Sequence, residues 1–376
     1  MVTIQEISVS DGGHALTSGY HRGACDRRSR TALVSCLLVF VGMQLGLDIA
    51  MDQFDPGLRD PEYGRKLESL KSQAAEKQVE PLLLALGTSR TVYGFRPTLP
   101  PGPAIRAFNF GITAIGTTYE LICLRRLLEA GIRPDRLFIE ILPPLLHQTP
   151  AFCDACGLDV TRLDWRDLQV LRRCGCRPDA AFQSWFRSRL VPCYSLRTAL
   201  LQRIARDWLD DAHRCDEVFG VKIDANGWLP YRRQAPGEQE RRRISDIFAG
   251  YYAKGFNGFE VSGPARRTVS EMLDLCRRER IDATVVLMPE GDAFRRCYSP
   301  DMLRKLDAYL SELKEEYCIQ VVDARDWCDD SQFSDGLHLL PDGAAIFSAR
   351  LEHEAIDPGT NPNPRLSSTI TSSRRR

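Results

Sequence analysis

The sequence predicts an α/β fold in which helices cover both faces of a parallel sheet. Short, continuous apolar runs are typical of strands that are buried on both faces. These runs alternate with stretches in which apolar residues recur at helical spacing, as expected of strand-helix-strand units. At 376 residues and 43% hydrophobic composition, the chain is long enough to bury a full core.

Four apolar runs are predicted to form the strands of this sheet. They are Pro81–Leu86, Arg136–Ile141, Ala283–Met288 and Cys318–Asp323. Before the second run, Thr117 and Glu120 have the spacing of a capping box, and Gly131 is placed to end the helix that follows it. Helical spacing predicts two further helices, which lead into the third and fourth runs.

The alternation defines the predicted domain organisation. The folded domain spans residues 81–353, with a helical insertion at about 145–260, where the alternation breaks and a lid over the site is one interpretation. Residues 51–80 are highly charged and are predicted to be a stem. Residues 354–376 are rich in Pro, Ser, Thr and Asn, and are predicted to be a disordered tail.

One apolar run, Thr31–Leu47, is long enough to cross a membrane. Basic residues precede it and aspartates follow it, which predicts a cytoplasmic tail at residues 1–30, a transmembrane anchor in the lipid bilayer at 31–50, and an extracytoplasmic domain beyond. A cleaved signal peptide is the alternative. We favour an uncleaved anchor because Asp48 stands where a cleavage site requires small residues.

The charge balance excludes one class of partner. Lysine and arginine together number 50, as do aspartate and glutamate. Without a basic surplus, we expect no nucleic-acid partner.

The chain has 13 cysteines. Six of them gather in the insertion: Cys153, Cys156, Cys174, Cys176, Cys193 and Cys215. An extracytoplasmic location allows disulfides, so we expect at least one bridge among the first four, or else buried thiols. Zinc is the alternative interpretation, but the second close pair lacks the usual spacing and no histidine pattern supports it. We predict neither a metal nor a cofactor.

Two segments carry residues suited to nucleophilic catalysis. Ser89 follows the first predicted strand, and Asp335 with His338 lies after the last one, ahead of a helix predicted near Pro341. The carboxyl ends of parallel strands meet at one edge, where ligands bind in such sheets. A serine needs a base, and the base needs an acid to orient it. Taken alone, a serine in this position is more often a helix N-cap than a nucleophile.

These segments, in this order, resemble the SGNH (GDSL) hydrolases. The run Gly87–Arg90 (Gly-Thr-Ser-Arg) with Ala107–Gly111 is similar to the membrane-anchored "GSSR" branch, which includes O-acetyltransferases of alginate and related polymers. The resemblance implies a flavodoxin-like three-layer sheet. It also implies that Ser89 is the nucleophile, His338 the base and Asp335 its orienting acid.

The resemblance further implies donors to the oxyanion. The backbone N–H of Gly111 matches the glycine donor of the family. The Gly-x-Asn-Asp block expected after the second predicted strand is absent, because Leu142-Pro143-Pro144 stands there. Asn109 is the substitute that we predict, although an asparagine capping the adjacent turn is an equal alternative.

Three further residues are candidates for substrate contact. Arg90 follows the serine directly, and Glu290 follows the third predicted strand at the same edge. Trp228 lies beside a turn and is either a platform for a sugar or part of the core.

The sequence therefore predicts an extracytoplasmic serine O-acyl esterase or O-acyltransferase that acts on an acylated glycan through an acyl-serine. Two alternatives remain open: a catalytically inert glycan-binding or assembly protein on the same fold, and a lipase-like esterase.

Overall fold

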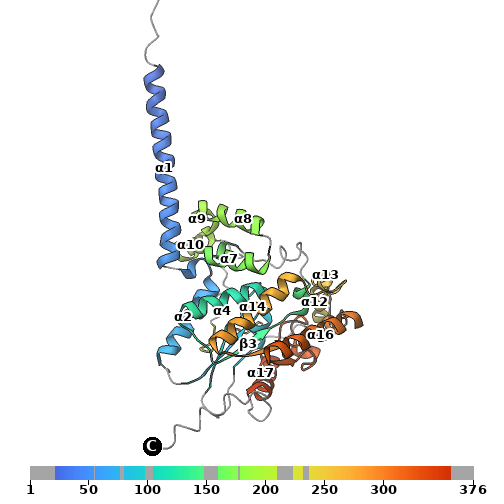
Figure 1. Ribbon diagram of the computed structural model, residues 1–376. Helices are drawn as coiled ribbons and strands as arrows, with labels where there is room; N and C mark the ends of the chain where they lie inside the picture. Colours follow the sequence, from blue (N-terminus) through green and yellow to red (C-terminus); the bar gives the residue numbers. More distant parts are fainter. Residues whose placement is uncertain are drawn as a thin grey trace, which may run out of the picture.

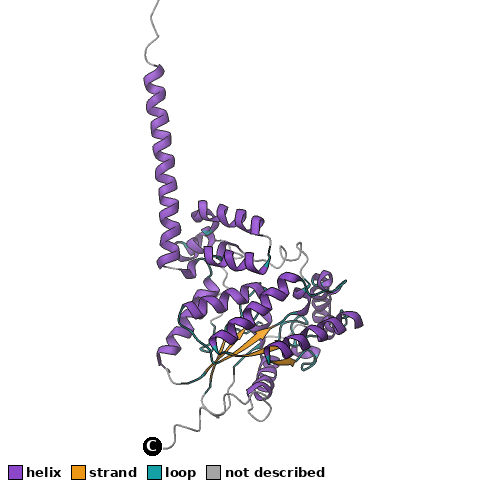
Figure 2. Cartoon of the chain, in the orientation of Figure 1, coloured by secondary structure: helices purple, strands orange, loops and turns teal. Residues whose placement is uncertain are grey.

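The computed structural model describes residues 22–54, 56–76, 80–97, 105–147, 160–176, 178–209, 223–231 and 237–356. These residues form a layered α/β domain from which one long helix projects (Figures 1 and 2).

The sheet has five parallel strands in the order β2-β1-β3-β4-β5. They are β1 (Leu82–Leu86), β2 (Arg106–Asn109), β3 (Arg136–Glu140), β4 (Asp282–Leu287) and β5 (Gln320–Asp323). The parallel α/β class is confirmed, and each of the four predicted strands is present. The prediction missed β2, a four-residue edge strand that begins with an arginine and therefore gives little apolar signal.

Helices cover both faces of the sheet. Leu82, Leu84 and Leu86 of β1 face one core cluster, and Leu83 and Ala85 face the other, as alternation along a strand requires. The first cluster is completed by α2 (Pro61–Glu76), α4 (Thr117–Glu129), α14 (Gly263–Glu279) and α16 (Pro300–Tyr317). The second is completed by α17 (Pro341–Ile356), the helix predicted near Pro341.

Helix α4 begins differently from the prediction. Gly116 is its N-cap, and no side chain makes a capping hydrogen bond there. Thr117 is already helical and Glu120 is buried, so the predicted capping box is wrong. The predicted end is confirmed: Gly131 has a φ of 80°, and the N–H of Ile132 bonds to Leu127 as in a helix-terminating turn.

The described part of the insertion consists of short helices in two groups. The first group comprises η2 (Val160–Arg162), α7 (Trp165–Cys174), α8 (Pro178–Leu190), α9 (Pro192–Ser195), α10 (Arg197–Ile204) and η3 (Arg206–Trp208). It lies beside the base of the projecting helix (Figure 1). The second group comprises α12 (Glu238–Tyr251) and α13 (Ala253–Phe256). The described residues also form short connecting helices: η1 (Pro56–Leu58), α3 (Ser89–Gly94), α5 (Pro143–Leu146), α15 (Asp292–Arg295) and η4 (Asp330–Gln332).

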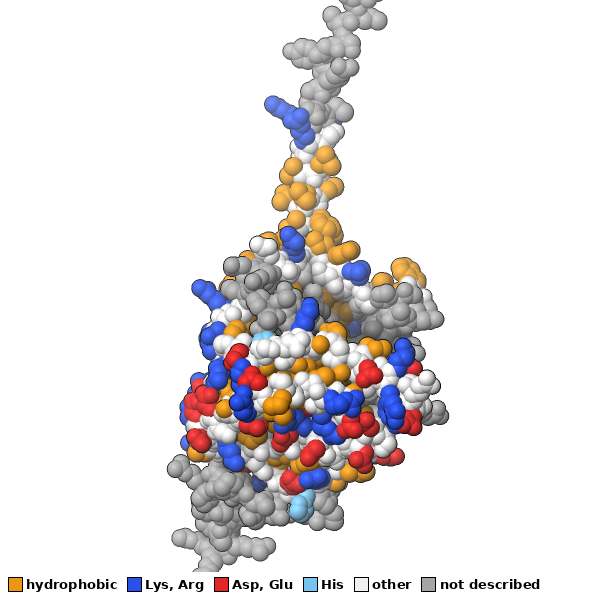
Figure 3. All heavy atoms as spheres, turned by 90° about the vertical axis from the view of Figure 1, so that its right-hand side faces the viewer, with side chains coloured by type: hydrophobic (Ala, Val, Ile, Leu, Met, Phe, Trp, Pro, Cys, Tyr) orange, Lys and Arg blue, Asp and Glu red, His pale blue; other side chains and the backbone are white. Residues whose placement is uncertain are grey.

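The projecting helix is α1 (Arg22–Phe54), and its stretch Arg27–Asp52 is long and apolar enough to cross a membrane. Hydrophobic side chains surround its projecting part, whereas charges of both signs cover the face of the domain in view (Figure 3).

The predicted stem is not a spacer. It contains α2, whose Tyr63 and Leu70 are buried in the main core cluster. Lys66 of the same helix is also buried, and its Nζ donates to the carbonyl of Asn109 over 3.1 Å. Its apolar residues Tyr63, Leu67 and Leu70 recur at i, i+4 and i+7, the spacing of an amphipathic helix, but the many charges around them hid this signal.

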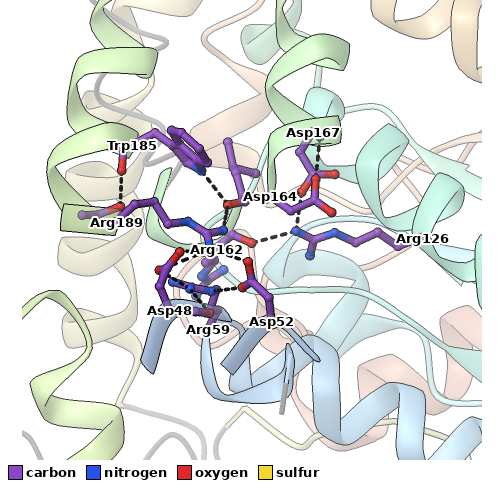
Figure 4. Close-up of polar contacts among 11 residues, drawn as sticks. Asp48, Asp52, Arg59, Arg126, Arg162, Asp164, Asp167, Trp185 and Arg189 are labelled. Atoms are coloured by element: carbon purple, nitrogen blue, oxygen red, sulfur yellow. Dashed lines mark hydrogen bonds and ion pairs between the residues drawn. The ribbon is translucent and has the colours of Figure 1, made fainter. Parts of the chain in front are cut away.

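An ion-pair network joins the base of α1 to the insertion (Figure 4). Asp48 and Asp52 of α1 pair with Arg59 and with Arg189 of α8, the latter at 2.6 Å from Asp52. Arg189 also donates to the carbonyl of Leu163 over 2.7 Å. The two arginines are buried, so their charges depend on these partners.

This network generates a prediction about α8. Replacing Arg189 with alanine leaves Asp48 and Asp52 without one partner, and we expect a local cost of about 1–3 kcal/mol. Hydrogen exchange of the full-length chain in detergent should show faster exchange of the α8 amides. The control is Arg187→Ala on the same helix, where the side chain is exposed. Equal exchange in the two variants would contradict a docking role for the network.

Candidate active site

The serine lies at the turn between β1 and α3. Thr88 is the N-cap of α3, and its Oγ1 accepts the N–H of Arg90. Ser89 is therefore the first helical residue, and the helix cap that we weighed as its alternative role belongs to Thr88. The Ser89 hydroxyl is left for another partner.

That partner is His338. The Oγ of Ser89 lies 2.8 Å from Nε2 of His338, although the two residues are 249 positions apart. Nδ1 of His338 lies 2.8 Å from Oδ2 of Asp335. The structure thus brings together the three residues that the sequence singled out, in the geometry of a nucleophile, its base and an orienting acid.

Asp335 is held rigidly. Its Oδ1 accepts the backbone N–H groups of Leu337 and His338, and the intervening Gly336 has a φ of 80°. Burial raises the pKa of Asp335, but the charge of His338 and the hydrogen bonds from these two residues outweigh it and hold the pKa below its ordinary value. The carboxylate form that stabilises a positive imidazole is thereby favoured.

The turn that carries Ser89 is fixed by Glu140 at the end of β3. Its Oε2 accepts the N–H of Thr88 at 2.8 Å and both the N–H and the hydroxyl of Thr91 at 3.2 and 2.6 Å. Its Oε1 accepts the hydroxyl of Thr88 at 2.9 Å. Gly87 is required by the same packing, since a Cβ there would lie 2.4 Å from the carboxylate.

Arg90 and Glu290 do not line the site. Their side chains are 2% and 0% exposed and lie 3.4 Å apart, so the predicted contact with substrate is not supported. Arg90 also donates to the carbonyls of Met288 and Pro289 at 2.6 and 3.2 Å. It therefore ties the nucleophile turn to the segment after β4 from within the protein.

The two predicted oxyanion donors already have partners. The N–H of Gly111 donates to Oδ1 of Asn109 at 2.9 Å. The amide nitrogen of Asn109 faces the carbonyls of Thr91, Val92 and Phe95, the nearest at 2.6 Å. In this geometry both residues stabilise the turn after β2. Asn109 therefore has the turn-capping role that the sequence offered as the alternative to an oxyanion donor.

Other backbone groups remain for an oxyanion. The N–H of Ser89 is at the start of α3, where no intrahelical acceptor exists, and it has no acceptor in the described part of the chain. The loop after β2 contains Ala114 with a φ of 55°, a conformation that alanine rarely adopts. Strain of this kind concentrates at functional sites.

Aromatic rings enclose His338. The ring centroids of Tyr231, Tyr93 and Phe248 lie 4.6, 5.3 and 5.8 Å from that of the imidazole. They come from three separate segments, two of them in the insertion, and sequence reasoning missed them because no local pattern links them. Trp228 is buried, and its Nε1 donates to the carbonyl of Tyr93 at 2.8 Å, so this tryptophan belongs to the core.

The cysteine predictions fall partly outside the described residues, which exclude Cys153, Cys156 and Cys215. Cys174, Cys176 and Cys193 are free thiols. Burial raises the pKa of Cys174 to about 11, which keeps this thiol protonated and unreactive. The described residues contain no group of three or more ligands suited to a metal.

Comparison with known proteins finds no family model and no curated protein that matches this chain.

The Glu140 geometry generates a prediction. Glu140→Gln replaces an acceptor of four hydrogen bonds, and we expect it to lower the free energy of unfolding by about 1–3 kcal/mol. Its matched control is Glu120→Gln. Burial, with a smaller effect from Glu140, raises the pKa of Glu120 and favours its neutral form, so an amide should cost less than about 1 kcal/mol there. Thermal unfolding in detergent measures both, and equal losses would contradict the anchoring role of Glu140.

Proposed function

We propose that this protein is a serine O-acyl esterase or O-acyltransferase of SGNH type, anchored in a membrane by α1 with its domain on the extracytoplasmic side. The observation that carries the proposal is the continuous chain of hydrogen-bond distances from Ser89 through His338 to Asp335. The strand order β2-β1-β3-β4-β5 adds support, because its flavodoxin-like arrangement places ligands at the carboxyl ends of the strands.

The chemistry divides into two steps. In the first, the Ser89 oxygen attacks the carbonyl carbon of an ester and its proton passes to Nε2 of His338. The imidazolium, stabilised by Asp335, then protonates the departing alcohol, which leaves an acyl group on Ser89. In the second step, His338 takes a proton from water or from a sugar hydroxyl as that oxygen attacks the acyl carbon. The bond between the acyl group and Ser89 then breaks, and His338 returns the proton to the Ser89 oxygen, which regenerates the serine.

The substrate class that we propose is an acylated polysaccharide or other cell-envelope glycan. Ser89 is partly exposed, so its hydroxyl is within reach of a large substrate. Tyr231 is half-buried beside His338 and presents an aromatic surface of the amphipathic kind that suits a polar ligand with apolar faces. Hydrolysis and transfer use the same groups and differ in the acceptor.

A second candidate is a catalytically inert glycan-binding or assembly protein. The observation that favours it is the engagement of Gly111 and Asn109 with protein partners, because a serine without oxyanion donors loses most of its catalytic advantage. The two candidates differ in whether Ser89 forms a covalent adduct.

The ion pairs at the base of α1 support the proposal that α1 stays attached to the domain and is not removed as a signal peptide. Cleavage near residue 50 would remove Asp48, which pairs with Arg59 and Arg189 of the domain. A helix that supplies partners to buried arginines is part of the folded structure.

Ser89→Ala and His338→Ala are each expected to lower turnover of an acetyl ester by about 10⁴- to 10⁶-fold, with the double variant little worse than either. Asp335→Asn should cost less, because Asp335 orients the imidazole. Ester hydrolysis and fluorophosphonate labelling are the measurements. The control is Ser262→Ala, which removes the N-cap of α14 and should leave both readouts unchanged.

Two results would overturn the assignment. Activity retained in Ser89→Ala would exclude this nucleophile. Glycan binding by the wild-type chain without turnover or labelling would establish the inert candidate.

The orientation is tested with reporters fused after residue 376. Alkaline phosphatase, which folds only outside the cytoplasm, should be active there, whereas a fluorescent protein that requires the cytoplasm should be dark. Fusions before residue 1 should give the reverse pattern, as the arginines ahead of the span predict. A bright fluorescent fusion at the C-terminus would contradict this orientation.

A further inference from the structure

An exposed apolar strip runs along α8 and into α9. It consists of Phe182, Phe186, Leu190 and Tyr194, which are spaced by four residues and are 43%, 48%, 47% and 67% exposed. The spacing places the three α8 residues on one face of the helix. Ser188, on the opposite side of α8, and Arg189, at the border of the strip, are buried against the protein. Helix α8 is thus held by one face and leaves its apolar face uncovered.

Neighbouring side chains enlarge this strip. Trp165, 55% exposed, packs edge-on against Phe182, and Phe182 stacks with Phe186 at 6.1 Å between ring centroids. Farther along the insertion, Ile204 and Trp208 are 80% and 82% exposed. The ring contacts of Trp165, Phe182 and Phe186 make that part of the exposed apolar surface contiguous, and such a surface marks an interaction site.

A hydrogen bond between α9 and α1 shows where along α1 the strip lies. Gln44 lies inside the apolar run of α1, yet it is buried, and its Oε1 accepts from the Sγ of Cys193 on α9 at 2.9 Å. Asp48, four residues farther along, pairs with Arg189 of α8. At 1.5 Å per residue, Gln44 lies about 6 Å along the helix axis from Asp48, toward the apolar side. Helices α8 and α9 therefore lie at the boundary between the apolar and charged parts of α1.

The composition of this surface matches one kind of partner. Tryptophan and tyrosine concentrate at the interface between membrane and water, where their rings meet the headgroups. Apart from Arg189, which is buried and paired with Asp48 and Asp52, residues 178–209 carry four arginines and two aspartates, a basic surplus that favours anionic headgroups. Figure 3 shows hydrophobic side chains on the edge of the domain beside the base of α1.

We infer that this surface rests on the lipid bilayer as a second membrane contact next to α1. The inference depends on the proposal that α1 spans a membrane, and it is independent of the catalytic chemistry. With two contacts, the domain cannot rotate freely about α1. The occupant is lipid, because the surface continues the apolar face of the span at the level where headgroups begin.

The test uses the full-length chain in bilayers with and without brominated lipids, which quench only fluorophores that reach the acyl region. A fluorescent amino acid replaces Phe186 in one variant and Tyr194 in a second, both at exposed positions. The matched control is the same label at Ile346 of α17, which is 55% exposed and lies at the other end of the domain (Figure 1). A label at Leu38, 66% exposed in the middle of the apolar run, reports on the span itself.

We expect brominated lipid to quench Phe186, Tyr194 and Leu38 by about twofold or more, since interfacial helices bury their apolar face about 5–10 Å deep. The signal at Ile346 should not change. Quenching at Leu38 alone would overturn the inference and leave the span intact. Quenching at none of the four positions would refute the span and the inference together.

Two other outcomes would also overturn the inference. Quenching at all four positions, Ile346 included, would indicate unspecific adsorption of the domain. Protection of Phe186 from aqueous iodide without quenching by bromine would show that a second copy of the chain or another protein covers the strip.

Discussion

The site depends on the packing of one buried carboxylate against the turn after β1. Glu140 takes hydrogen bonds from both the backbone and the hydroxyls of Thr88 and Thr91, the residues on either side of the Ser89–Arg90 pair. Because β1 and β3 are neighbours in the sheet, the end of one strand fixes the turn that follows the other. Ser89 is thus positioned by its surroundings, and its own hydroxyl is left to His338. The Asp335–His338 turn completes the arrangement and has its own internal bonds.

Helix α2, which follows α1 in the chain, is bonded directly to the loop after β2, next to the candidate site. Glu62 of α2 accepts both the N–H and the hydroxyl of Thr113, and Lys66 donates to the carbonyl of Asn109, so α2 holds both ends of the loop after β2. Burial lowers the pKa of Lys66 to about 8, which is the cost of holding an ammonium group inside the protein. Asp60, just before α2, accepts the hydroxyl of Tyr119 in α4. The segment that follows α1 therefore cannot move without disturbing the loop after β2.

The sequence predicts what is local or strongly patterned. Apolar strands, their parallel class and the Asp335–His338 turn follow from short-range signals, and the shared edge of a parallel sheet links Ser89 to that turn. Contacts between distant segments give no such signal: Tyr231 and Phe248 meet His338 only after the insertion has folded back. Arg90 was misjudged for a related reason. Its position at the site edge is visible in the sequence, but the direction of its side chain, inward to Glu290, depends on the segment after β4.

The buried carboxylate of Glu140 lies close to Ser89, so its negative charge affects the chemistry that we propose for this serine. A negative charge at Glu140 opposes both proton loss from Ser89 and the growth of an oxyanion nearby, because charges interact strongly in a low-dielectric interior. The four hydrogen bonds to Glu140 disperse that charge, and Nε of Arg90 lies 3.8 Å from it as a buried counter-charge. Arg90 in turn faces Glu290, whose pKa is raised by burial although the charge of Arg90 opposes that shift. Arg90 thus supports the nucleophile through charge and position, without contact with a substrate.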